Sequence, residues 1–493
     1  MHFLRFIIPV LISFSLFSCS EKDSSALSVA VAQEPVVLDL MVNSSVSGRN
    51  IVDGNVYERL IALSDGNLVP QLAESFELGD SGKTLTIKIR EGVLFHDGSE
   101  LDAEDAVLSM NRWLSYYASA ERLVGDSRFT ASGDCISIKA DSSLVLLPFM
   151  IASSPLAAVI VPAEEILSLD DGEILQSVAG TGPYRMKEWR YGDSIELERW
   201  DEYWGEMPEI EHITYSFVPD SVTRRLGLES GQFDFIDTVL SDDIPQLSKM
   251  DGITLHQGDE NGSIVLVFNK KAGVSADADF RKAVSLLIDR DELMKACYGD
   301  YGYSLHSDYM EADSLWSVDD SSDPFGTENE EKGLEYLRAS SYDNEPVRIL
   351  SSNLTNLDKI AIALSSELEE EGIETEIIIL DWAAFIEKRK DPEFWDIYVS
   401  ATSSTILPLE KNYLTATSPG GFDNPESETL LKAVAETESV EEAISIWQDC
   451  QKSLWNYIPV IVPGHYSTVY ASVSTLENID FTNGFNFRKA AVK

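Results

Sequence analysis

Basic side chains are scarce in this sequence. Its 493 residues include 37 Lys and Arg against 84 Asp and Glu, which gives a formal net charge of −47 at pH 7. A chain this acidic repels the phosphates of nucleic acids and the headgroups of anionic membranes. We therefore exclude nucleic acid and anionic membrane surfaces as partners. The acidity indicates either a well-solvated surface or a site for a cationic solute.

Cysteine is also rare, with Cys19 near the N-terminus and only Cys135, Cys297 and Cys450 after it. Three thiols allow at most one intramolecular disulfide. None stands in a CxxC motif or near a histidine at metal-ligand spacing, so burial as small apolar side chains is their simplest interpretation.

Motifs of catalysis and cofactor binding are missing. The six histidines form no HExxH pair, and there is no GxSxG nucleophile elbow. The glycine-rich run Gly180–Tyr184 (GTGPY) lacks the GK[ST] of a phosphate-binding loop, and its proline removes a backbone donor, so we interpret it as a turn. We predict no catalytic residue, no metal site and no cofactor.

Long apolar runs are absent beyond the N-terminus. Phe6–Phe17 is apolar, follows the basic residue Arg5, and has the length of a signal-peptide core rather than of a membrane span. Leu16–Cys19 (LFSC) resembles a lipobox, so we predict cleavage before Cys19 and attachment of lipid to it. Ordinary signal cleavage beside an incidental cysteine is the alternative.

These features predict a signal peptide at 1–18, a lipidated tether at 19–25, and a mature protein outside the cytoplasm. It would lie in the periplasmic space or on the cell surface, and only its lipid would hold it to a membrane.

Val56–Arg112 is the most informative stretch. Leu85, Ile87 and Ile89 alternate with polar residues, which predicts a half-buried strand. Asp102 is placed to cap a helix that follows it. The same stretch carries, in order, YExL, DGNxVPxLAES, LTIKIREGVxFHDG and LxAEDxVxSxxR.

These ordered motifs resemble the peptide-binding class of bacterial extracytoplasmic solute-binding proteins, the receptors of oligopeptide, dipeptide and nickel ABC importers. Further segments resemble the same family: GTGPY, Asp201–Pro208 (DEYWGEMP) and Phe280–Leu293 (FRKAVSLLIDRDEL). The resemblance covers nearly all of the mature chain. Phe280–Leu293 also has helical spacing, and Val347–Leu380 is predicted from its own pattern to form a parallel β-α-β unit.

The resemblance implies an α/β fold, namely a two-lobe periplasmic binding protein of type II with the extra α/β domain of the peptide-binding class. We expect lobe I at 26–55, 181–267 and 471–493, the extra domain at 56–180, and lobe II at 268–470. The crossings between lobes are expected near Asn269 and Tyr466, and Asp308–Glu331 is expected to be an acidic surface loop.

The resemblance also implies a ligand cleft between the lobes. It assigns these ligand-binding residues: Glu34, Ser44, Ser45, His96, Asn261, Gly262, Ser263, Trp382, Thr402, Ser403, Ser404 and Thr405. Trp113, Trp316, Trp382 and Trp395 are each either cleft-wall or core residues.

The sequence departs from the family at one expected contact. Peptide receptors of this class commonly carry an aspartate that pairs with the ligand's α-amino group, but no acidic residue lies between Asp396 and Glu410. Small hydroxyl residues stand there instead, and they are either ligand contacts or a plain polar loop. A buried ammonium needs a partner. Either another carboxylate, for example Glu34, supplies the charge, or the ligand has no free amine there.

The sequence therefore predicts a monomeric, lipid-anchored receptor that passes a peptide-like small solute to an ABC permease. An oligosaccharide receptor and a nickel or metal-complex receptor on the same fold are the alternatives, and a secreted hydrolase is the alternative from another class. Aromatic faces with hydroxyls in the cleft favour sugar, a histidine or carboxylate cluster favours metal, and a nucleophile bonded to a base favours the hydrolase.

Overall fold

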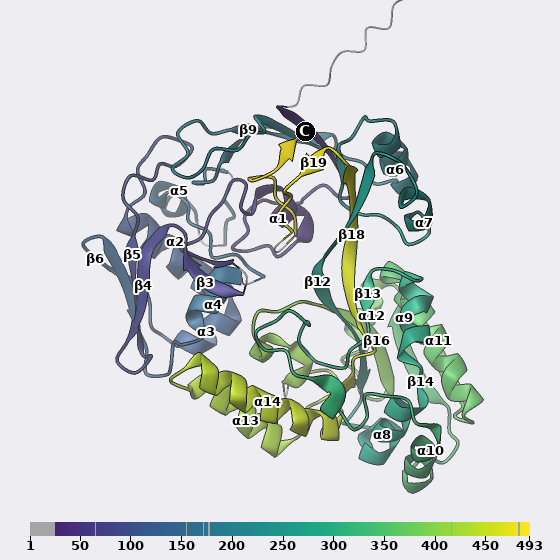
Figure 1. The fold of residues 1–493 in the computed structure, drawn as a ribbon. Helices are drawn as coiled ribbons and strands as arrows, with labels where there is room; N and C mark the ends of the chain where they lie inside the picture. Colours follow the sequence, from purple (N-terminus) through teal and green to yellow (C-terminus); the bar gives the residue numbers. More distant parts are fainter. Residues whose placement is uncertain are drawn as a thin grey trace, which may run out of the picture.

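A long mixed sheet organises the chain (Figure 1). The computed structural model describes residues 25–493 apart from 65, 154, 171, 176, 177, 416, 482 and 483 and the side chain of 355. The predicted signal peptide, Cys19 and nearly all of the tether lie outside the described residues. Along its main path the sheet has the order β15 (Thr375–Leu380), β14 (Val347–Ser352), β16 (Ile397–Ser403), β12 (Ile253–Phe268), β18 (His465–Val473), β11 (Phe235–Ile236), β1 (Ala26–Val31), β10 (His212–Phe217), β9 (Ser194–Arg199) and β8 (Tyr184–Arg190). Two short strands join this sheet, β13 (Tyr303–Ser304) beside β18 and β17 (Val460–Ile461) beside β12.

Strand β12 is shared by the two halves of the sheet. Up to Ser263 it pairs antiparallel with β18, and from Gly262 onward it pairs antiparallel with β16. The register with β18 shifts on either side of Glu260, which marks a bulge where the strand changes partner. A Cβ on Gly262 would lie 1.8 Å from the Thr402 carbonyl oxygen, so only glycine fits at this close approach. The change of partner thus precedes Asn269, where the sequence predicts the first crossing.

A separate unit is formed by the part of the chain between β1 and β8, which are the first two strands of the large sheet in sequence order. It contains the hairpin β2 (Ile61–Ser64) and β3 (Asn67–Pro70), and the antiparallel sheet β4 (Ala73–Gly79), β5 (Thr84–Ile89), β7 (Cys135–Lys139) and β6 (Thr130–Ser132). Its helices are α2 (Ala103–Tyr116), α3 (Ala118–Val124), α4 (Leu147–Ser153) and α5 (Ala163–Leu167). All these elements fall within 56–180, the predicted extra domain, although the exact domain boundaries stay a prediction.

The remaining helices cover the two ends of the large sheet (Figure 1). In the half that contains β1 are α1 (Val46–Val52), α6 (Ser221–Glu229) and α7 (Ile244–Leu247). At the other end are α8 (Ala278–Leu287), α9 (Arg290–Tyr298), α10 (Glu330–Ala339), α11 (Leu357–Glu370), α12 (Trp382–Lys388), α13 (Pro425–Glu436) and α14 (Val440–Tyr457). The chain ends in the hairpin β19 (Leu476–Glu477) and β20 (Ala491–Val492).

Local patterns predicted several elements correctly. The alternating apolar residues of β5 are buried, and Asp102 caps α2 together with Asp105 in a reciprocal capping box. Strands β14 and β15 are parallel and are joined by α11, as the pattern of Val347–Leu380 predicts. The GTGPY run leads into β8, and a Cβ on Gly180 would lie 2.0 Å from the Val56 carbonyl oxygen, so the run is a close-packed turn.

Two expectations were wrong. Phe280–Leu293 is not one helix: α8 ends at Leu287, and Asp289 caps the new helix α9 by accepting hydrogen bonds from two backbone N–H groups. Asp308–Glu331 is not simply a surface loop, because Asp308, Tyr309 and Trp316 are all buried. Apolar residues within this acidic segment pack inward, and this brings the segment against the interior of the molecule.

Candidate solute site

The main cavity lies where the separate unit, β12 and the second half of the chain meet. Its volume is about 570 Å³, within the usual range for small-molecule sites, about 300–1,000 Å³. Its wall includes Arg49 of α1, Phe149 of α4, the bulge of β12 at 259–261, the loop 311–316 and the end of β16 with the residues after it, 403–406. Segments from distant parts of the chain thus surround one space.

A smaller cavity of about 330 Å³ adjoins the main one. The two share Pro155, Ser403, Ser404 and Thr405 in their walls. Trp382, whose ring is 40% exposed, lines only the smaller cavity. The shared hydroxyl residues stand on the border between the two cavities. Both walls include aromatic residues, namely Phe149, Trp316 and Phe481 in the main cavity and Trp382, Tyr398 and Tyr413 in the smaller one.

Carboxylates dominate the main cavity. Asp259, Glu260, Glu311 and Asp313 line it, whereas Arg49 is the one basic residue among its described lining residues. Partial burial, and then the charges of Asp313, Asp480 and Glu260, raise the pKa of Asp259. Neither Asp259 nor Asp313 pairs with a basic side chain in the part of the chain that is described. This wall therefore attracts a positively charged group.

Arg49 lies on the same wall and carries the opposite charge. Burial lowers the pKa of its guanidinium, and its Nε is buried without a hydrogen-bond partner in the described structure. Arginine is well suited to hold a carboxylate through paired N–H donors. The cavity thus offers carboxylates and one arginine to the same solute.

Glu260 forms a cluster with two histidines at the bulge of β12. Its Oε1 lies 3.1 Å from His306 Nε2, and its Oε2 lies 3.7 Å from His465 Nδ1. The Ser304 hydroxyl and the Ala312 N–H also donate to this carboxylate, the latter at 2.8 Å. The two imidazole rings are stacked, with 3.9 Å between centroids and 10° between planes.

The surroundings give the three members of the cluster different pKa shifts. Burial acts to raise the pKa of Glu260, but hydrogen bonds from His306, Ser304 and Ala312 lower it well below its usual value. Burial acts to lower the pKa of His306, but Glu260 raises it. Burial, and then repulsion by His306, lower the pKa of His465, which is therefore neutral.

Glu311 and Lys411 form a buried ion pair between the two cavities. Lys411 Nζ lies 3.0 Å from Glu311 Oε1, and their side chains are 1% and 11% exposed. Burial raises the pKa of Glu311 although Lys411 opposes the shift. This pair ties the loop after Asp308 to the segment after β16, and it neutralises one of the four cavity carboxylates.

Many of the predicted site residues lie on these cavities. Ser44, Asn261, Ser403, Ser404 and Thr405 line the main one, and Trp382 and Thr402 line the smaller one together with Ser403–Thr405. The Asn261 amide is hydrogen-bonded to Thr468. Their roles in binding stay a prediction.

Other predicted site residues have structural partners instead and line neither cavity. Glu34 accepts from Trp189 Nε1 at 2.9 Å and from the Gly192 N–H at 3.0 Å. His96 lies against the backbone of GTGPY, with Nε2 2.8 Å from the Gly182 carbonyl, and burial lowers its pKa to about 4. Ser45 caps α1, while Ser263 is buried against Thr402, and Gly262 forms the close approach described above.

No sequence motif marks the charged residues at the main cavity or the two histidines beside them. Glu260, His306 and His465 are far apart along the chain and share no motif spacing, so only the pairing of β12, β13 and β18 brings them together. Asp313 lies within Asp308–Glu331, the segment that the sequence predicts to be a surface loop. In a chain with 84 acidic residues, no local pattern distinguishes a site carboxylate from a solvated one.

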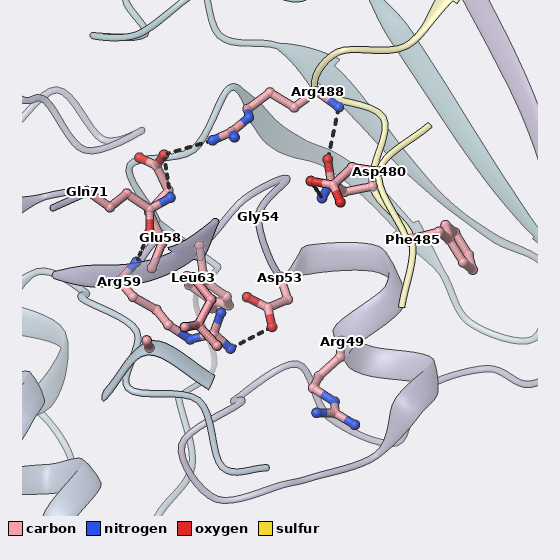
Figure 2. A pocket seen from close by; sticks show the side chains of 14 residues that line it. Arg49, Asp53, Gly54, Glu58, Arg59, Leu63, Gln71, Asp480, Phe485 and Arg488 are labelled. Atoms are coloured by element: carbon pink, nitrogen blue, oxygen red, sulfur yellow. Dashed lines mark hydrogen bonds and ion pairs between the residues drawn. The ribbon is translucent and has the colours of Figure 1, made fainter. Parts of the chain in front are cut away.

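A third cavity, of about 100 Å³, is lined in part by a different carboxylate, Glu58 (Figure 2). Glu58 Oε1 accepts from the Tyr203 hydroxyl at 2.9 Å and from Gln71 Nε2 at 3.2 Å. Glu58 Oε2 accepts from Trp204 Nε1 at 2.8 Å and from the Thr181 hydroxyl at 3.1 Å. Burial raises the pKa of Glu58, and these donors oppose the shift. All four lone-pair positions of the carboxylate are used within the protein.

No helix in the described part of the chain combines the length and apolar character needed to cross a membrane.

Comparison with known proteins agrees with this architecture. The family model described as bacterial extracellular solute-binding proteins, family 5 (middle region), matches residues 67–424. The dipeptide-binding protein of Escherichia coli K12 is 22% identical over 458 residues, which cover 85% of each chain. The oligopeptide-binding protein AppA of Bacillus subtilis 168 is 25% identical over 375 residues, which cover 69% of this chain and 67% of the relative.

Solved structures share the whole fold. The ABC transporter substrate-binding protein CtaP of Listeria monocytogenes superposes with a TM-score of 0.85 at 20% identity, covering 96% of this chain and all of that one. A peptide-binding protein AppA of Clostridium difficile gives 0.84 at 20% identity over 95% of this chain and all of that one. These structures confirm the predicted fold class, and the family model confirms the resemblance. The chain belongs to the bacterial extracellular solute-binding proteins of family 5.

Proposed function

We propose that the protein is a lipid-anchored receptor that captures a peptide or peptide-like solute with a free amino group and delivers it to an ABC importer. The observation that carries this proposal is the arrangement of charge in the main cavity, where unpaired carboxylates and Arg49 line one space of suitable size. A peptide with free termini has a positive and a negative end and complements both. The printed names of relatives, a dipeptide-binding and an oligopeptide-binding protein, support the same solute class.

The aspartate that peptide receptors of this class commonly carry is absent between Asp396 and Glu410. Ser403 and Ser404 occupy the place of the absent aspartate, and they line the same cavity as Asp259 and Asp313. We infer that these carboxylates take over the pairing with the solute's ammonium, while the hydroxyls contact neutral groups. Glu34 is less suited to this role because its oxygens accept from Trp189 and Gly192.

The other predicted solutes and activities receive less support. A sugar site needs aromatic faces, and Phe149, Trp316 and Phe481 on the main cavity would serve one. A neutral sugar would, however, leave the charges of Asp259, Asp313 and Arg49 in that cavity without partners. Hydrolysis by a serine relay needs a serine bonded to a histidine at the cavity, whereas the Ser472 hydroxyl, 2.8 Å from His256 Nε2, is buried and lines neither cavity. The metal alternative is favoured by a histidine cluster, and one is present at Glu260.

Calorimetry with one peptide in two forms tests the proposal. A dipeptide with a free amino terminus should bind at least about tenfold more tightly than its N-acetylated form, because a charge-assisted hydrogen bond is worth roughly 1.5–3 kcal/mol. Asp313→Asn should remove much of this preference, while the exposed Glu77→Gln on β4 should leave it unchanged. Equal affinities for both forms in the unmodified protein would instead show that no carboxylate pairs with the solute's amino group. They would favour a solute whose neutral groups contact the hydroxyls of Ser403 and Ser404.

The anchor is tested independently. Cys19→Ala should abolish lipid attachment, so the protein should be released from membranes or remain unprocessed. Fractionation and mass spectrometry of the N-terminus measure this. A processed Cys19→Ala protein that stays in the membrane fraction would contradict the lipoprotein prediction.

A further inference from the structure

The Glu260–His306–His465 cluster has the spacing of a metal site. One ligand atom from each residue lies within 4.8 Å of the others. The carboxylate oxygens lie 3.1 Å from His306 Nε2 and 3.7 Å from His465 Nδ1. Ligands about 2.0–2.1 Å from a tetrahedral ion lie roughly 3.3 Å from one another. Because the two imidazole planes are nearly parallel, one ring must turn out of the stack before both nitrogen lone pairs point at one ion.

His465 presents a lone pair to this position. Its side chain is fully buried, and its Nε2 lies 2.9 Å from the Asp308 carbonyl oxygen. A carbonyl only accepts, so Nε2 carries the hydrogen and Nδ1 carries the lone pair. This Nδ1 has no hydrogen-bond partner among the described residues, and the nearest charged group is the Glu260 carboxylate.

Two electron-rich atoms therefore face each other in a buried place. Buried polar atoms without a partner are uncommon in folded proteins and call for an explanation. A cation between His465 Nδ1 and Glu260 would convert this repulsion into two favourable contacts. An imidazole held by a backbone carbonyl on its far nitrogen is also the common arrangement of histidine ligands in metal sites.

Glu260 is likewise held in place. The Ser304 hydroxyl and the Ala312 N–H each donate to one of its oxygens. A carboxylate has about four acceptor positions, and the contacts of His306 Nε2, at 3.1 and 3.2 Å, occupy the rest, so a metal ion would take the place of the His306 contacts. The bulge of β12 aims this side chain at the histidines, because the register shifts on both sides of Glu260.

A plain ion pair between Glu260 and protonated His306 is the competing explanation. It accounts for their 3.1 Å contact. It leaves His465 Nδ1 without a hydrogen-bond partner among the described residues.

We propose that Glu260, His306 and His465 bind one divalent transition-metal ion of the Zn²⁺, Ni²⁺ or Cu²⁺ class. Two imidazole nitrogens and one carboxylate oxygen suit these ions, whereas Mg²⁺ and Ca²⁺ prefer oxygen ligands throughout. Because Glu260 lines the main cavity, the ion's remaining coordination positions face the solute. The inference does not depend on which solute the receptor carries.

Calorimetry on the mature protein after treatment with a chelator tests this site. Zn²⁺ should bind with a stoichiometry of one per chain, and Mg²⁺ at the same concentration should not. Glu260→Gln and His306→Gln should each weaken Zn²⁺ binding at least about tenfold, since even indirect partners of metal ligands commonly contribute that much. His212→Gln, an exposed histidine at the start of β10, is the matched control and should bind as the unmodified protein does.

A measurement on the unmodified protein covers the case of a variant that does not fold. X-ray absorption at the zinc edge should show imidazole neighbours at about 2.0–2.1 Å. Absence of stoichiometric Zn²⁺ binding, a spectrum without imidazole, or unchanged binding in folded Glu260→Gln and His306→Gln proteins would each overturn the proposal and leave the ion pair as the explanation.

Peptide binding in the presence of chelator separates this inference from the proposed function. Retained peptide binding without any Zn²⁺ binding would overturn the metal site alone. Stoichiometric Zn²⁺ binding by a protein that binds no peptide would overturn the peptide proposal alone.

Discussion

Glu58 and Glu260 are both enclosed carboxylates held by hydrogen bonds from several segments, but their surroundings differ. Four side-chain donors fill every acceptor position of Glu58, whose side chain is fully buried. Glu260 lines the main cavity and takes part of its bonding from His306, and the neighbouring His465 Nδ1 has no hydrogen-bond partner among the described residues. A carboxylate held by four neutral donors stabilises the fold, whereas one that shares its oxygens with a histidine can exchange that contact for a cation. Two mutational experiments test this contrast, and a third concerns a carboxyl on the smaller cavity.

The largest effect is expected at Glu58. Glu58→Ala leaves the donors of Tyr203, Trp204 and Thr181 without their buried acceptor, so it should lower the free energy of unfolding by about 3 kcal/mol. Urea denaturation measures the loss. Glu77→Ala, an exposed glutamate on β4, is the control and should change stability by less than about 0.5 kcal/mol. A loss at Glu58 as small as the control's would show that its hydrogen bonds do not hold the fold.

Amide replacements should then separate the two carboxylates. In Glu58→Gln the new NH₂ group must face donors that cannot accept, such as Trp204 Nε1 or Gln71 Nε2, and the cost should be about 2 kcal/mol. In Glu260→Gln the oxygen at the Oε2 position can still accept from Ala312, and the NH₂ group at the Oε1 position can donate to the Ser304 hydroxyl or to Nε2 of a neutral His306. Its cost should stay below about 1 kcal/mol. Thermal and urea unfolding of both variants in chelator provide the comparison, and equal losses would remove the distinction.

The third experiment concerns Glu410, on the wall of the smaller cavity. Burial raises the pKa of this carboxyl to about 7, above the ordinary 4.5. The protonated form therefore favours the folded state, and this contribution is complete below pH 4.5 and is lost as pH rises through 7. Glu410→Gln should remove this slope and gain about 2 kcal/mol over the unmodified protein between pH 5 and pH 8. Parallel curves for the two proteins across this range would refute the assignment.

Sequence alone predicted the fold better than the site, and the reason is physical. Alternation in β5 and helical spacing in α11 depend on nearest neighbours in the chain, so local patterns indicate them. The family-like motifs YExL, GTGPY and DEYWGEMP supply Glu58, Thr181, Tyr203 and Trp204, and the last three donate hydrogen bonds to Glu58, the carboxylate labelled in Figure 2. The motifs that carry the resemblance here thus maintain the architecture.

The candidate site could not be predicted in the same way. Glu260, His306 and Asp313 stand in stretches without a motif, and they become neighbours only through a bulge and a loop that folds inward. The family resemblance brought Ser403 and Ser404 to attention because an expected aspartate is absent near them. It had no means of pointing to carboxylates supplied by other segments.

The position of β18 has a consequence for the order in which the chain can fold. This strand is the only link between β12 and β11 along the described path of the large sheet, yet it consists of His465–Val473, about 200 residues after β12. During synthesis the two parts of the sheet remain unjoined until residues 465–473 have left the ribosome. Contacts of such long sequence separation form slowly.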